Sequence, residues 1–250
     1  MKTTSADQNE STSSSTSLFS SAQNTPTDQF ETKYKKHQKL GSGCSSTAYA
    51  CTLRNNMTFT CVLEEKIEDK PCETKLCVKV TKFTDEAKLP ACENEFSLLQ
   101  SLSHPAIVKC HDFYPDLVNN QCMTVLDRIE GTGLDQLSCD EKTTLVIIRK
   151  VCEALRYMHS MNVCHRDLKP DNLIVDGENI VIIDFNVGAR MDTEGNVSGG
   201  QGLKEWSAPE TRRSFVYNGA KADAWSLGLI FGYLLNGKVP TAEITAEERA

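Results

Sequence analysis

The chain has 250 residues, of which 39% are hydrophobic and 24% are charged, and its formal net charge is -7 with an isoelectric point near 5.3. This length and composition are typical of a folded chain with an apolar core. Because the negative charge leaves no general positive field, we expect neither nucleic acid nor an anionic membrane surface as a partner.

The sequence shows neither a secretory signal nor a membrane segment. Its start, "MKTTSADQNE", lacks an apolar stretch, and the longest apolar run, residues 225–235, is shorter than the ~20 residues that span a bilayer. We therefore expect a location in the cytosol, with the nucleus as the alternative. Eleven cysteines occur singly, without a C-x-x-C pair. We interpret them as small buried hydrophobes in a reducing compartment, and metal ligation or a disulfide is the less favoured alternative.

The first predicted elements are a tail and a small sheet. Residues 1–30 are rich in Ser, Thr, Gln and Asn and predict a disordered tail, because they bury too little apolar surface to offset the entropy of ordering. Alternating runs around a Gly/Ser-rich turn over residues 34–53 predict a β-hairpin, and "KLCVKV" at 75–80 predicts a third strand. The polar interval 54–73 resembles an insertion. Apolar residues at helical spacing over 89–102 predict a helix that the following "HP" ends.

The second half of the chain is mainly helical by its pattern. Strands are predicted at 106–114 and 121–129, followed by a helix over 143–161 that is apolar on more than one face. The runs "NLIV" and "IVIIDF" then predict a short hairpin. This order predicts an α+β fold of two lobes, a small sheet with one helix and then a helical lobe, joined by a hinge near residues 127–133.

The segment "CHRDLKPDN" carries the groups that phosphoryl transfer requires. Asp167 offers an acceptor that orients a hydroxyl nucleophile, Lys169 offers a cation for the transferred phosphate, and Asn172 offers an oxygen for a metal ion. Taken alone, the same three residues also fit a solvated loop. The motifs around the segment favour the first interpretation.

From residue 34 to residue 250 the chain resembles the eukaryotic protein kinase family, with the motifs in the family's order. Before the segment, "LGSGCSSTA" is similar to the glycine-rich loop, with Ser46 in place of the third glycine. After it, "DFN", "SAPE" and "DAWSLG" are similar to the metal-binding turn, the end of the activation segment and the helix that anchors the catalytic loop. The resemblance implies a bilobal kinase fold with an N-lobe at 34–127 and a C-lobe at 134–250 that lacks the family's last helices.

The resemblance also implies roles for individual residues. Phosphate transfer would rest on a base, two lysines and a glutamate that pairs with one of them: Asp167, Lys169, Lys79 and Glu95. Magnesium ions would bind Asn172 and Asp184. ATP would lie against a larger set: Leu40, Gly41, Ser42, Gly43, Ala48, Cys77, Lys79, Leu126 and Leu173. Lys169 favours serine or threonine as the acceptor. The sequence around the loop that carries it is similar to that of the calcium/calmodulin-dependent protein kinases.

Three features depart from the family pattern. Asn186 replaces the glycine of the metal-binding turn, and we expect it to adopt a positive φ at a cost of about 1 kcal/mol. Leu203 replaces a threonine that braces the catalytic aspartate, which predicts reduced activity. The chain stops soon after "LLNGKVP", where the family continues through further helices, so we expect a fragment.

The function implied is that of a serine/threonine protein kinase that uses ATP and Mg²⁺, and the alternative is a nucleotide-binding pseudokinase that acts as a scaffold. Arg166 before the catalytic aspartate predicts activation by a phosphate on Ser198, with Thr193 as second choice. Three carboxylates expected near a substrate peptide favour basic residues before its acceptor: Asp171, Glu130 and Asp135. The oligomeric state stays open.

Overall fold

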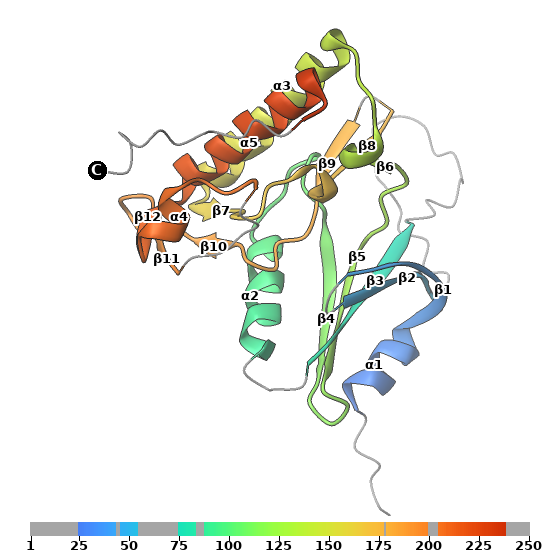
Figure 1. Ribbon diagram of the computed structural model, residues 1–250. Helices are drawn as coiled ribbons and strands as arrows, with labels where there is room; N and C mark the ends of the chain where they lie inside the picture. The colour runs from blue at the N-terminus through green and yellow to red at the C-terminus, as the bar shows by residue number, and fades with distance from the viewer. Residues whose placement is uncertain are drawn as a thin grey trace, which may run out of the picture.

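The computed structural model describes residues 25–43, 46–54, 75–83, 88–177, 179–199 and 205–238 (Figure 1). Most of the predicted tail, nearly all of the predicted insertion, Leu203 and the end of the chain lie outside the described residues. The described part forms two lobes, a sheet with two helices and a mainly helical lobe, which confirms the predicted α+β class.

Helix α1, Pro26–Lys33, precedes the sheet and starts at a complete capping box. The Thr25 hydroxyl accepts a hydrogen bond from the Asp28 N–H, and the Asp28 carboxylate accepts one from the Thr25 N–H. Phe30 is 2% exposed and packs against two tyrosine rings of the sheet. The predicted disorder is therefore wrong for residues 26–30, because a cap and one buried aromatic order a segment whose average composition is polar.

The small lobe contains an antiparallel sheet in the strand order β1-β2-β3-β5-β4. Its strands are β1 (Tyr34–Ser42), β2 (Ser46–Leu53), β3 (Leu76–Lys82), β4 (Cys110–Asp116) and β5 (Gln121–Asp127). Helix α2, Leu89–Gln100, lies against β4 and β5. The predicted hairpin, third strand and helix are confirmed. The strand predicted from residue 106 starts later, since Ile107 instead forms a parallel bridge with Ile182.

The large lobe is built on two long helices that lie side by side, α3 (Glu141–Ser160) and α5 (Gly219–Asn236) (Figure 1). Each starts at a side-chain cap, Asp140 for α3 and Asn218 for α5. The shorter elements are β6 (Thr132–Gly133), η2 (Leu134–Gln136), β7 (Val163–Cys164), η3 (Pro170–Asn172), β8 (Leu173–Asp176), β9 (Asn179–Ile182), β10 (Ala189–Arg190), β11 (Asn196–Ser198), α4 (Glu210–Arg213) and β12 (Val216–Asn218). The predicted hairpin is β8 and β9.

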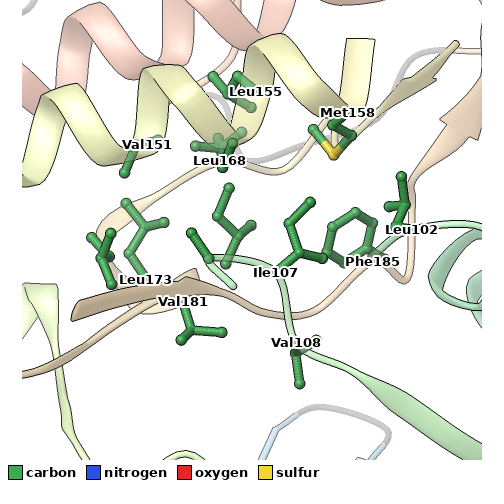
Figure 2. Close-up of a cluster of buried hydrophobic side chains, with 14 of the residues drawn as sticks. Leu102, Ile107, Val108, Val151, Leu155, Met158, Leu168, Leu173, Val181 and Phe185 are labelled. Atoms are coloured by element: carbon green, nitrogen blue, oxygen red, sulfur yellow. The ribbon is translucent and has the colours of Figure 1, made fainter. Parts of the chain in front are cut away.

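One hydrophobic cluster connects these elements and fixes the loop between β7 and β8 (Figure 2). Figure 2 shows side chains of α3 facing Leu168 of the loop, Leu173 of β8 and Ile107 of the segment before β4. Leu168 lies in the loop itself and is 1% exposed, and Phe185 beyond β9 is fully buried. Leu168 and Phe185 thus anchor this loop and the turn after β9 in the core. Truncation of such a buried side chain leaves a cavity and typically lowers the free energy of unfolding by several kcal/mol.

The described cysteines all carry free thiols, and most of them are buried. Among the described helices, none combines the length and the apolar character that a membrane crossing requires.

Candidate active site

Lys79 on β3 connects the two lobes. Its Nζ lies 2.8 Å from Glu95 Oε1 on α2 and 2.9 Å from Asp184 Oδ1 after β9. Burial works against the charge of Lys79, but the two carboxylates outweigh it, so the pKa of Lys79 is raised. The strand, the helix and the turn therefore meet at one ammonium group, as predicted for Lys79 and Glu95.

Asp184 stays ionised beside this lysine. Burial alone would raise the pKa of its carboxyl group, but the charge of Lys79 and its hydrogen bond lower it below the usual value. Its backbone lies in the left-handed region, with φ at 65°. The next residue, Phe185, packs its ring edge-on against His165, and its N–H donates to Glu95 Oε1 at 3.2 Å.

Asn186 does not adopt the positive φ that we expected, since the described residues with positive φ include Asp184 but not Asn186. The turn places its unusual backbone angle two residues earlier. The Asn186 side chain instead reaches Lys79, with its Oδ1 2.8 Å from Nζ. The expectation of strain at Asn186 is therefore wrong, and a contact that the sequence did not predict takes its place.

The loop between β7 and β8 brings the remaining predicted groups together. Lys169 Nζ donates to Asp167 Oδ2 at 2.8 Å, and Asn172 Nδ2 donates to the Asp167 carbonyl oxygen at 2.8 Å and to Oδ2 at 3.2 Å. Asp223 of α5, 1% exposed, accepts the backbone N–H groups of His165 and Arg166. The loop is thus held at fixed positions by its own side chains and by α5.

Four of the residues predicted to contact ATP share one face of the sheet: Ala48, Cys77, Lys79 and Leu126. Register pairs Ala48 with Lys79 and Cys77 with Leu126, and paired residues point to the same face. All four therefore point to the side where Lys79 meets Asp184. Leu173 on β8 is fully buried in the large-lobe cluster, so its contact with a base stays a prediction.

Four more of the residues predicted to contact ATP lie at the end of β1 and directly after it. Leu40, Gly41, Ser42 and Gly43 are all exposed, and the Gly43 N–H donates to the Ser46 carbonyl oxygen at 2.9 Å. Among the described residues, no atom lies within 4 Å of a Cβ built on Gly41 or Gly43. Packing within the described chain does not demand these glycines, and the space over them admits a close ligand.

Residues 34–250 match the family described as protein kinase domain. The chain belongs to the protein kinase family. It is 32% identical over 154 residues to a probable serine/threonine-protein kinase of Dictyostelium discoideum, which covers 59% of the chain and 18% of that protein. It is 30% identical over 183 residues to myosin light chain kinase family member 4 of Mus musculus, and 28% identical over 184 residues to the Homo sapiens protein of that name. The alignments with the mouse and human proteins each cover 70% of the chain and 47% of the relative. The chain therefore spans less than half the length of each of the three relatives.

Protein kinases use ATP and typically Mg²⁺, and the donor atoms of this chain fit that ion. Asn172 uses Nδ2 for Asp167 and keeps its Oδ1 for a metal, and Asp184 keeps a second oxygen beside the one that Lys79 contacts. The described residues contain no cluster of three or more His, Cys, Asp or Glu that would bind a metal by itself. Magnesium commonly binds one or two protein oxygens and completes its coordination with phosphates and water.

A tyrosine that sequence reasoning missed organises the segment after the site. Arg166 donates through Nε to the Tyr217 hydroxyl at 2.8 Å and through a terminal nitrogen to the carbonyl oxygens of Ser198 and Gly199. Arg166 thus contacts the backbone of Ser198. Tyr217 lies in β12, which pairs with β11 and thereby lies beside the segment that Arg166 contacts.

The three carboxylates predicted to attract basic substrates differ in their surroundings. Glu130 forms ion pairs with Lys75 and Arg128, and the hydrogen bond from Lys75 lowers the pKa of its carboxyl group. Asp171 and Asp135 are exposed near the loop that carries Asp167. These two are therefore better placed than Glu130 to meet a basic peptide.

Proposed function

We propose that the chain is a serine/threonine protein kinase that transfers the γ-phosphate of ATP to hydroxyl groups of protein substrates. The observation that carries the proposal is the position of Lys79 Nζ, which contacts Glu95 of the small lobe and Asp184 of the large lobe at 2.8 and 2.9 Å. That contact brings the phosphate-binding lysine and a metal ligand to one place, as an in-line transfer between bound reactants requires.

Asp167 acts as the general base in this proposal. Its Oδ2 accepts hydrogen bonds from Lys169 and Asn172, so its Oδ1 is left to orient the substrate hydroxyl and take its proton. Lys169 keeps its positive charge beside the transferred phosphate, and Lys79 contacts the other phosphates. Bound magnesium supplies neutralisation of the charge that develops on the phosphate oxygens.

The substrates proposed are proteins with serine or threonine acceptors and basic residues before them. The support for basic residues is the exposed pair Asp171 and Asp135. The support for serine or threonine is Lys169, together with the Dictyostelium discoideum relative, which is named a probable serine/threonine-protein kinase. A peptide array with arginine or lysine at each upstream position measures the preference. Equal phosphorylation of basic and neutral peptides would contradict it.

Phosphate transfer from radiolabelled ATP to a protein substrate tests the function itself. Asp167→Asn removes the proposed base and should reduce transfer by about 100-fold or more, since general base catalysis typically contributes 10²–10⁴-fold. Asp176→Asn, a change of an exposed aspartate at the end of β8, is the matched control and should transfer phosphate like the unmodified chain. Equal transfer by all three proteins would show that the signal does not come from this site.

A nucleotide-binding pseudokinase that acts as a scaffold is the second candidate. Two features favour it. Leu203 replaces the threonine that braces the catalytic aspartate, and Asn186 accepts a hydrogen bond from the Lys79 ammonium group that ATP should contact. Nucleotide binding without transfer, equal in the chain and in Asp167→Asn, would establish this alternative.

A further inference from the structure

Two thiols meet between α2 and β5, outside the groups used in the proposed reaction. Cys92 lies in α2 and is 7% exposed, and Cys122 lies in β5 and is fully buried. Both side chains belong to one small hydrophobic cluster of buried residues. That cluster contains Phe83, Leu89 and Phe113. Because α2 and β5 also contact each other, the two thiols lie on elements that pack directly together.

The two thiols differ in their chemistry in a way that suits disulfide formation. Cys92 is the fourth residue of α2, where backbone N–H groups and the helix dipole favour a thiolate. The hydrogen bond from Cys122 lowers the pKa of Cys92, against the opposing effect of burial. The pKa of Cys122 is raised by the same hydrogen bond and by burial. Cys92 is thus the nucleophile, and Cys122 keeps its proton.

We propose that Cys92 and Cys122 form a disulfide when the chain meets hydrogen peroxide, and that this bond fixes α2 against β5. The Cys92 thiolate attacks one peroxide oxygen, the O–O bond breaks, and a sulfenic acid and one water form once the leaving hydroxide is protonated. The Cys122 sulfur then attacks the Cys92 sulfur, the S–O bond breaks, and the Cys122 proton leaves with the oxygen as a second water. Two thiols are oxidised by two electrons in total, and one peroxide is reduced to two waters.

The disulfide would hold the helix where it serves the site. Glu95 follows Cys92 by three residues, so both side chains lie on one face of α2. Since Glu95 contacts Lys79 in the same conformation in which both thiols lie in one buried cluster, the covalent bond forms from the paired state and preserves it. Formation of the disulfide is independent of the proposed function, and its effect on phosphate transfer rests on that function.

Peptide mapping after peroxide treatment tests the bond directly. Trypsin cuts after Lys88, Lys109 and Arg128, so Cys92 lies alone in peptide 89–109 while peptide 110–128 contains Cys110 and Cys122. We expect the two peptides joined with the loss of two hydrogen atoms. The joined species should persist in Cys110→Ser and in Cys152→Ser, whose thiol is exposed, and disappear in Cys92→Ser and in Cys122→Ala. The proposal is overturned if Cys152 is oxidised while peptide 89–109 stays unlinked, or if the link survives in Cys122→Ala, which would place it on Cys110.

Hydrogen exchange of α2 tests the mechanical consequence without any phosphate transfer. In the oxidised chain the amides of residues 89–100 should exchange at least about threefold more slowly than in the reduced chain, because the helix cannot leave β5. The Cys92→Ser protein should show no such change on peroxide treatment. A disulfide that leaves the exchange of α2 unaltered would overturn the claim that it fixes the helix, whatever the chain's activity.

Discussion

Lys79 Nζ has three N–H donors, and the protein supplies acceptors for all of them. Glu95 offers oxygens at 2.8 and 3.1 Å, Asp184 one at 2.9 Å and Asn186 one at 2.8 Å. A phosphate oxygen must therefore replace one of these partners. Asn186 is uncharged and exposed, so its hydrogen bond is the easiest of the four to replace.

Removing this competing amide should strengthen nucleotide binding. Asn186→Gly should lower the Kd for ATP by about threefold, because an exposed hydrogen bond of somewhat under 1 kcal/mol no longer has to be broken. Asn186→Asp should raise the Kd instead, since a third carboxylate beside Lys79 repels phosphate. Fluorescence titration with ATP measures both. A higher Kd in Asn186→Gly would show that the amide contributes to nucleotide binding rather than competing with it.

The ion pair of Lys79 and Asp184 should contribute equally to stability across the neutral range. The pKa of Asp184 is lowered, so its contribution is present above the unfolded value of 3.8 and is lost as pH falls through the lower folded value. The pKa of Lys79 is raised, so its contribution is present below 10.5 and is lost only as pH rises through the higher folded value. The pair is therefore fully charged from about pH 5 to pH 9.

Thermal unfolding of the chain and of Asp184→Asn at several pH values checks this window. The variant should be less stable by about 1 kcal/mol at pH 7, a modest figure because the Asp184 side chain is 34% exposed and solvent screens it. The difference should be the same at pH 5.5 and should shrink as pH falls below about 5, where the unfolded carboxylate begins to take up protons. A difference that grows on acidification would contradict the lowered pKa.

At the scale of elements, the strand pair β11–β12 carries the residue that orients the segment after the site. Burial raises the pKa of Tyr217, so its hydroxyl stays neutral and accepts from Arg166. Tyr217→Phe should lower kcat by about fivefold, the effect of one lost orienting bond of ~1 kcal/mol.

Ser198→Ala should change kcat by less than about twofold, because Arg166 contacts the backbone carbonyl oxygen of Ser198, which the substitution leaves in place. Steady-state kinetics of Tyr217→Phe and Ser198→Ala decide whether Arg166 depends on Tyr217 or on a phosphate on Ser198.

Local pattern predicted most of the elements, and long-range contacts decided the rest. The β1–β2 hairpin, α2, α3 and the β8–β9 hairpin follow from alternation or helical spacing within the segment itself. Helix α1 was missed because its stability depends on Phe30 reaching tyrosines that lie further along the chain. In the site, the motif residues were predictable by resemblance. The contacts of Asn186 and Tyr217 were not, since they depend on side-chain direction and on strand pairing.

At the scale of the whole molecule, α5 supports the site from a distance in sequence. Asp223 accepts from the backbone N–H groups of His165 and Arg166 at 2.9 and 2.8 Å, and from His159 Nε2 of α3 at 2.9 Å. One buried carboxylate thus links two long helices to the loop that carries Asp167. Arg166 has φ at 69°, so the loop depends on these bonds to keep an unfavourable backbone angle.

Removing the charge of Asp223 should therefore affect both stability and catalysis. Asp223→Asn should destabilise the chain by about 3 kcal/mol, because an amide places its own N–H groups against buried donors and leaves some of them unsatisfied. Phosphate transfer should fall by more than tenfold even at temperatures where the variant remains folded, since the loop is free to leave its strained conformation. Thermal unfolding and transfer assays should be run beside Asp176→Asn, a change of an exposed aspartate at the end of β8. Normal transfer by a folded Asp223→Asn protein would show that α5 supports the fold but does not position the catalytic loop.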